Sequence, residues 1–452
     1  NSVRSLMEME EVRSAEPIGF LIITVLVAVS LLTAARLLIA LGAWISGRLQ
    51  RYIPQKVSIA ISVILVALFV NALTNEIVAR GLLSLADGIS LAADQYIEHG
   101  ISPPLGEDQC GGPESLVPWP SIGRQGKLFL TTGPTSEQIQ SYSSTEVKQP
   151  IRVYVGMRSA DDEKARAKLA LQELIRVGGF ERSMLIVATP TGTGWLDEGA
   201  VDSVEYLHRG DTAIVSTQYS YLPSWITLLV DPPRAKHSAT ALFDEIYAYW
   251  TKLPKDQRPK LYLFGLSLGA YGCEQAADLM ETFEDPIQGA LWSGTPFPSS
   301  QWKEIVSTRN PGSPAWLPQF RDGRMVRFHN QTTEPDVERP WGPIRNLYLQ
   351  HASDPMVWFS PSLAWQRPSW LIGTRGEDVS PYLRWYPIIT FLQVAFDLPL
   401  ATTTPIGYGH NYSPDGYING WVTVSETEGW TDEDLERLKK ALTFRTTSSP
   451  PS

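Results

Sequence analysis

The residues with the clearest capacity for chemistry surround one serine. The stretch LYLFGLSLGAYG, residues 261–272, places Ser267 between Gly265 and Gly269, after an apolar run and before a sequence of helical character. A strand that turns abruptly into a helix can hold a serine in a strained elbow with its Oγ exposed above the sheet, and flanking glycines leave room for that turn. The five-residue pattern alone occurs often by chance, so its context carries the prediction that Ser267 is a nucleophile. The alternative is an ordinary small residue in a tight turn.

A nucleophilic serine needs a base, and the base needs an acid that orients it. Where the serine lies on such an elbow, the acid follows it in the chain and the histidine comes last. Asp354 follows the apolar run RNLYLQ, and His410 is the one histidine after it, in a loop rich in Gly and Pro. We therefore predict that Ser267, Asp354 and His410 form a catalytic triad. Asp378 is the alternative acid, and His351 is expected to be structural.

The oxyanion of an acyl-transfer intermediate needs backbone N–H donors. We expect one from Leu268, the residue after the nucleophile, and another from the loop Thr191, Gly192, Thr193 that follows the apolar run SMLIVA. Glycines there allow close approach to a ligand, although a plain Gly-rich turn is the alternative. The loop lacks the Lys-Ser/Thr ending of a phosphate loop, and the sequence has no His-Glu-x-x-His or paired Cys-x-x-Cys cluster. We therefore expect neither a metal nor another cofactor.

The chain contains two cysteines, Cys110 and Cys273. An extracytoplasmic location would permit a disulfide, and only one intramolecular pairing exists, so we predict that they are joined. The alternative is two free thiols, with Cys273 buried as a small apolar residue.

Stretches typical of strands and helices alternate through the C-terminal part. The strand candidates are GKLFLTT, IRVYVGM, SMLIVATP, TAIVSTQYS, KLYLFG, GALWSG, MVRFHN and RNLYLQ. The helix candidates between and after them are DDEKARAKLALQELIRVG, HSATALFDEIYAYWTKL, LGAYGCEQAADLMETF and DEDLERLKKALTF. Several strand candidates are continuous apolar runs, as expected of strands covered on both faces. The alternation predicts an α/β fold with a mostly parallel sheet and flanking helices.

Length and charge limit the other possibilities. A chain of 452 residues allows one large domain and an appendage. Its net charge of −10 argues against nucleic-acid binding, which needs a basic surface. We divide the chain into a membrane region at 1–98, a lead-in rich in Pro and Gly at 99–124, and a catalytic domain at 125–452.

Two apolar stretches, 17–46 and 57–74, are about as long as the roughly 20 residues that span a bilayer as a helix. The loop between them carries Arg48, Arg51 and Lys56, so the positive-inside rule places it in the cytoplasm and the large C-terminal part on the other side. Residues 76–97 have amphipathic helical spacing. This helix is expected either to lie along the membrane surface or to pack as an ordinary helix.

The motifs CGGPESLVPW, PIRVYVG, TPTGTGWLD, QYSYLPSW, LYLFGLSLGAYG, LYLQHASDPMVWF, FLQVAFDLP and GYGHNY resemble those of a family of bacterial membrane-anchored α/β-hydrolases. Members of that family join an N-terminal multi-span membrane region to a C-terminal hydrolase domain. The resemblance implies Ser267, Asp354 and His410 as the triad and the bacterial plasma membrane as the location. The family usually carries more than two spans, so we expect that further spans precede Asn1.

Together these features predict a membrane-bound serine hydrolase that cleaves a carboxylic ester or thioester, of a lipid, through an acyl-enzyme. The apolar stretch QYSYLPSWITLLVDPP at 218–233 would line an acyl pocket or form a lid, or else be a buried strand and connection. Acyl transfer to another acceptor remains open because the same triad serves both reactions. A non-catalytic membrane assembly or transport subunit on the same scaffold also remains open, as does a homo-oligomer.

Overall fold

The computed structural model describes residues 2–7, 16–74, 101–276, 282–335 and 338–448. The chain divides into two compact units, one up to Ile89 and one from Ser90 onward. Each unit is described by itself.

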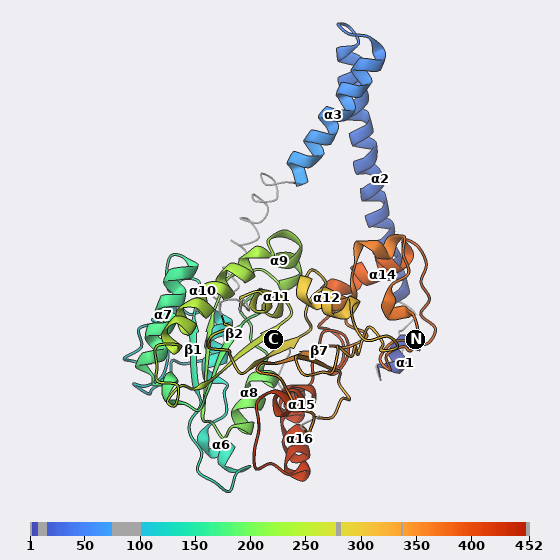
Figure 1. The fold of residues 1–452 in the computed structure, drawn as a ribbon. Helices are drawn as coiled ribbons and strands as arrows, with labels where there is room; N and C mark the ends of the chain where they lie inside the picture. Colours follow the sequence, from blue (N-terminus) through green and yellow to red (C-terminus); the bar gives the residue numbers. More distant parts are fainter. Residues whose placement is uncertain (1, 8–15, 75–100, 277–281, 336–337, 449–452) are drawn as a thin grey trace. The chain divides into compact units, whose positions relative to one another are not determined.

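The first unit is helical (Figure 1), with α1 at Ser2–Leu6, α2 at Glu16–Leu49 and α3 at Gln55–Thr74. The turn between α2 and α3 is held by the Ser58 hydroxyl, which donates to the carbonyl of Ser46 at 2.7 Å. Among the residues whose side chains the structure describes, Ala28–Leu49 is the one segment long and apolar enough to cross a membrane. The second predicted span, 57–74, is helical as part of α3, which runs for 20 residues from Gln55 to Thr74. The amphipathic helix predicted at 76–97 lies outside the described residues.

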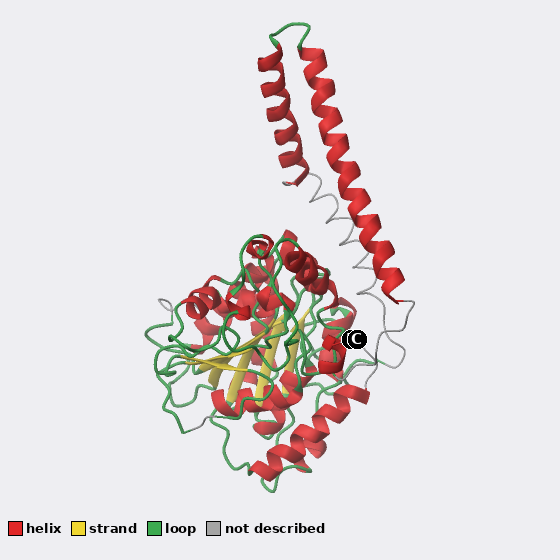
Figure 2. Cartoon of the chain, turned by 90° about the vertical axis from the view of Figure 1, so that its right-hand side faces the viewer, coloured by secondary structure: helices red, strands yellow, loops and turns green. Residues whose placement is uncertain are grey.

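The second unit is built on a seven-stranded sheet in which every neighbouring pair is parallel (Figure 2). Its strand order is β1-β3-β2-β4-β5-β7-β6. The strands are β1 Ile151–Val155, β2 Met184–Thr189, β3 Thr212–Thr217, β4 Lys260–Leu266, β5 Gly289–Ser293, β6 Val326–His329 and β7 Arg345–Leu349. The inner strands are buried along nearly their whole length, which explains why they are continuous apolar runs rather than alternating ones.

Helices cover both faces of the sheet (Figure 1). One group contains α7 Glu163–Arg176, α10 Pro233–Trp250 and α11 Leu268–Glu274, and the opposite group contains α8 Glu198–Leu207, α15 Pro414–Val424 and α16 Asp432–Ser448. The shorter helices are α5 Arg124–Thr131, α6 Ser136–Gln140, α9 Ser224–Val230, α12 Ser300–Ser307, α13 Pro355–Trp358 and α14 Ile389–Asp397. The 3-10 turns are η1 Trp119–Ser121, η2 Gly179–Glu181, η3 Pro361–Ala364, η4 Ser369–Leu371 and η5 Leu398–Leu400.

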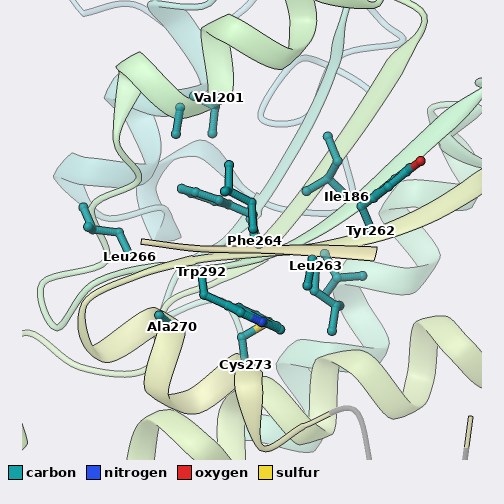
Figure 3. Close-up of a cluster of buried hydrophobic side chains, with 14 of the residues drawn as sticks. Ile186, Val201, Tyr262, Leu263, Phe264, Leu266, Ala270, Cys273 and Trp292 are labelled. Atoms are coloured by element: carbon teal, nitrogen blue, oxygen red, sulfur yellow. The ribbon is translucent and has the colours of Figure 1, made fainter. Parts of the chain in front are cut away.

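The central strand β4 anchors the core on both of its faces (Figure 3). Tyr262 and Phe264 project to one face, and Leu263 projects to the other, toward the side that carries Cys273. The Phe264 ring packs against Trp421 of α15, with ring centroids 6.1 Å apart. Because β4 is packed on both faces, it is a rigid support for Ser267, the residue that follows its last position.

One local prediction is wrong. The stretch GKLFLTT lies in helix α5 up to Thr131, with Gly126, Lys127 and Phe129 buried on one side of the helix. A short apolar run does not distinguish a helix from a strand. The predicted lead-in at 99–124 packs onto the second unit over its described part, because Cys110, Val117 and Ile122 are buried in the main core.

Candidate active site

Ser267 follows the last residue of β4 directly and has the backbone angles φ 57° and ψ −124°. A serine with positive φ is unusual, and the neighbouring glycines make the conformation feasible. A Cβ atom at Gly265 would lie 2.5 Å from the Ala270 nitrogen, and one at Gly269 would lie 2.2 Å from the Thr189 oxygen. The predicted strand–elbow–helix geometry is therefore present, and both glycines are required by close backbone contacts.

The elbow lies beside the carboxyl end of β5. The Ser267 N–H donates to the Ser293 carbonyl at 2.9 Å, and the next residue, Gly294, has φ 53°. A Cβ atom at Gly294 would lie 2.6 Å from Cε1 of His410, so the imidazole rests directly against this backbone. The end of β5 thus contacts both the serine and the histidine, which are 143 positions apart in the sequence.

His410 is paired with the predicted acid. Its Nδ1 lies 2.7 Å from Oδ2 of Asp354, whose carboxylate is fully buried after β7. Oδ1 of Asp354 accepts the backbone N–H of Met356 at 2.8 Å, and Oδ2 also accepts the hydroxyl of Tyr412 at 2.8 Å. With Nδ1–H donating to the carboxylate, Nε2 is the basic nitrogen of the ring. Among the described residues, neither Nε2 nor the buried Oγ of Ser267 has a hydrogen-bond partner.

The backbone of Gly409, the residue that precedes His410, is held from two sides. The Gly409 N–H donates to Oγ of Ser353 at 2.9 Å, and the Gly409 carbonyl lies 2.9 Å from Nδ1 of His351. Burial lowers the pKa of His351, which favours its neutral form with Nδ1–H as the donor. The His410 ring is therefore positioned by Ser353 and His351 as well as by Asp354.

Asp378, the alternative acid, has a supporting position in this network. Its Oδ2 accepts both the backbone N–H and the hydroxyl of Ser353, at 2.8 and 2.7 Å. It therefore acts on His410 through Ser353 and Gly409, whereas Asp354 bonds to the imidazole.

Three residues of this constellation were missed in the sequence: Tyr412, Ser353 and Gly294. Tyr412 is two positions after His410, and Ser353 is one position before Asp354. In the sequence, only their proximity to the predicted triad could have indicated these residues. Their roles depend on contacts between β5, β7 and the His410 loop, which the sequence does not show.

The predicted oxyanion donors differ in their bonding. Leu268 is the first residue of α11, and N–H groups in the first turn of a helix have no intrahelical partner. In the opposing loop, the Thr191 N–H donates to the Trp195 carbonyl at 2.9 Å and the Gly192 N–H donates to the Ser224 hydroxyl at 2.8 Å. The Thr193 N–H has no partner among the described residues. The N–H groups of Leu268 and Thr193 are therefore available to a ligand, whereas those of Thr191 and Gly192 already donate hydrogen bonds within the protein.

An apolar group of side chains adjoins these residues. We call it the apolar site cluster, and its buried members are Tyr219, Leu228, Ala235, Leu268, Met356, Phe359, Leu398 and Ala401. Leu268 follows the serine and Met356 lies two residues after the acid, so the cluster reaches both. The stretch 218–233 contributes two members and forms a buried connection followed by α9, rather than a strand.

The cysteines are both free and buried, so the predicted disulfide is wrong for this structure. Cys110 contacts the carbonyl of Tyr154 in β1 at 3.7 Å, whereas Cys273 lies on α11, which packs against β4. Strands β3 and β2 separate β1 from β4, at about 4.8 Å per strand, and a disulfide needs Cα atoms within about 7 Å. Burial raises the pKa of both thiols to about 12.

Within the described residues, no group of three or more His, Cys, Asp or Glu side chains is arranged to hold a metal ion.

Comparison with known proteins gives two family matches. A family model described as "Alpha/beta-hydrolase family" matches residues 151–438, and one described as "Alpha/beta-hydrolase family N-terminus" matches residues 1–134. The chain has no significant match among curated proteins or among solved structures. The first match covers the whole sheet and all three residues of the predicted triad.

Proposed function

Because the chain belongs to the alpha/beta-hydrolase family, we propose that it is a membrane-anchored serine hydrolase that cleaves a carboxylic ester or thioester, of a lipid. One observation carries the proposal: the buried Asp354–His410 pair, 2.7 Å apart, rests against the strand end that holds the strained Ser267. An isolated buried histidine or aspartate would need no such elbow beside it.

In the proposed mechanism, Ser267 Oγ attacks the substrate carbonyl carbon while His410 Nε2 takes the hydroxyl proton. The Asp354 carboxylate stabilises the imidazolium, and the N–H groups of Leu268 and Thr193 are the proposed donors to the oxyanion. His410 then gives the proton to the leaving alcohol or thiol, and an acyl-enzyme remains. Water, deprotonated by His410, then attacks this ester, and His410 returns the proton to the Ser267 oxygen as the carboxylic acid leaves.

The apolar site cluster supports an acyl group as the part of the substrate that is bound. Leu268 and Met356, next to the serine and close to the acid, are both buried within it. Burial of apolar surface contributes roughly 25 cal/mol per Å², so an acyl chain would gain binding energy that a polar substrate would not.

We also propose that helix α2 anchors the protein in a bacterial plasma membrane and that the catalytic unit lies on the extracytoplasmic side. The apolar segment Ala28–Leu49 supports the anchor, and the basic residues Arg48, Arg51 and Lys56 support the orientation. A second span through 57–74 belongs to the same proposal.

Labelling with a fluorophosphonate probe tests the chemistry. The purified full-length protein is expected to react, and Ser267→Ala is expected to abolish the reaction. Ser216→Ala is the matched control, because Ser216 is also a fully buried serine at a strand of the same sheet and its hydroxyl is likewise unpartnered among the described residues. Equal labelling of wild type and Ser267→Ala would refute the assignment. An unlabelled wild type would favour the non-catalytic subunit.

A further inference from the structure

Helix α14, Ile389–Asp397, has apolar side chains on both of its faces (orange in Figure 1). On the inner face, Phe391, Val394 and Ala395 pack against the apolar site cluster. On the outer side lies what we call the α14 apolar face: Ile388, Ile389, Leu392, Phe396 and Leu400, which are 37–61% exposed. At 100° per residue, Ile389, Leu392 and Phe396 point away from the inner set, and the exposed Ile388 and Leu400 flank the two ends of the helix.

The backbone fixes this orientation. The Ile388 N–H donates to the Ala364 carbonyl at 3.0 Å, and the Tyr386 N–H donates to the hydroxyl of the buried Thr390 at 2.9 Å. Ile388 itself has φ 63°, an unfavourable angle for a β-branched residue, and yet its side chain is 61% exposed. Folding of the unit gains little from an isoleucine that is both strained and exposed.

Neighbouring residues extend the patch. Trp365, Tyr382 and Tyr386 are 69, 76 and 53% exposed. From Val379 to the end of α14, Arg384 and Asp397 are the two charged residues, whereas the chain as a whole carries a net charge of −10. Aliphatic side chains with Tyr and Trp beside them and few charges match the boundary between lipid headgroups and acyl chains.

We propose that the α14 apolar face enters the headgroup–acyl boundary of a lipid bilayer and brings the apolar site cluster next to the acyl chains of membrane lipids. This inference rests on the proposed function and extends it, because it names the lipid bilayer as the source of the substrate. Two observations select a bilayer as the occupant. The same chain carries a helix apolar and long enough to cross a membrane, and the inner face of α14 is continuous with the cluster that contains Leu268.

Site-directed fluorescence tests the contact with lipid. Leu392→Cys in the full-length protein is labelled with an environment-sensitive dye, and Leu105→Cys serves as the control because Leu105 is 91% exposed in the same unit. The native thiols Cys110 and Cys273 are buried and do not compete for the dye. The proteins are reconstituted in vesicles of phosphatidylethanolamine and phosphatidylglycerol containing a brominated phosphatidylcholine.

The dye at position 392 is expected to shift to shorter wavelength and to be quenched by the brominated lipid, while the dye at 105 responds to aqueous iodide. Iodide quenching at 392 equal to that at 105 would overturn the proposal. Shielding of position 392 from both quenchers would also overturn it, because the face would then be covered by protein from this chain or a second copy.

Activity gives a second measurement. Leu392→Glu is expected to reduce hydrolysis of a vesicle-borne ester by roughly tenfold or more, and to reduce hydrolysis of a dissolved short-chain ester much less. Leu105→Glu is expected to change neither. An equal loss on both substrates would contradict a role at the bilayer. Fluorophosphonate labelling of the same preparations distinguishes the two proposals. If the dye at position 392 is quenched by lipid but the protein is not labelled, the hydrolase proposal is refuted and the bilayer contact still holds.

Discussion

The strain at Ser267 predicts an unusual response of stability to substitution. With φ 57° and ψ −124°, the residue occupies a region that non-glycine residues rarely adopt, at a cost of roughly 1–3 kcal/mol. Ser267→Ala keeps that strain, and the buried hydroxyl it removes has no partner among the described residues. Ser267→Gly relieves the strain but increases the freedom of the unfolded chain, at a cost of roughly 0.5–1 kcal/mol.

The Gly variant is therefore expected to be more stable than the Ala variant by roughly 0.5–2 kcal/mol. For a unit that runs from Ser90 to Ser452 this corresponds to an increase of about 1–3 °C in the apparent Tm, measured at one scan rate on the whole chain in detergent. Neither variant should react with the fluorophosphonate probe, so the comparison is independent of activity.

Ser216 in β3 provides the matched control. It is fully buried, its hydroxyl also lacks a partner among the described residues, and its φ is not positive. At this position the Gly variant should be less stable than the Ala variant by at least the entropic cost. If glycine also destabilises relative to alanine at Ser267, the inference of a strained elbow is wrong.

Three other features of the structure give further predictions. Gly294→Ala should reduce kcat/KM about 100-fold or more, because the added Cβ displaces His410. Gly312→Ala is the control, because Gly312 also has positive φ but no atom lies near its Cβ position. Equal activities of the two variants would contradict the contact between Gly294 and His410. Burial lowers the pKa of His208 to about 4, so below pH 6.5 the unfolded state binds a proton that the folded state does not, and stability falls by up to roughly 3 kcal/mol between pH 6.5 and 4. Chemical unfolding of His208→Gln should show a correspondingly shallower dependence on pH, and an unchanged slope would argue against this. Both cysteines should be alkylated by iodoacetamide after unfolding without reductant and protected before it, and a disulfide-linked peptide in mass spectrometry would contradict their separation.

Local sequence patterns determined the parallel sheet. The runs SMLIVATP, TAIVSTQYS and KLYLFG have no polar alternation, which is the pattern of strands buried on both faces, and they became β2, β3 and β4. The same reasoning failed for GKLFLTT, because whether three adjacent apolar residues form strand or helix depends on what packs against them. The Pro- and Gly-rich sequence of the lead-in likewise does not reveal that apolar side chains such as Cys110 enter the core.

The sequence alone also predicted the elbow and the order of acid and base, since glycine spacing and chain order are local properties. Tertiary structure decided the rest of the site. Ser293 and Gly294 lie between the serine and His410 only because β4, β5 and β7 are neighbours in the sheet. The same packing lets Asp354 bond to the imidazole, while Asp378 bonds to Ser353 instead. Strand order likewise separates Cys110 from Cys273. Contacts between segments far apart in the chain depend on the packing of the whole sheet, and no local pattern of residues encodes them.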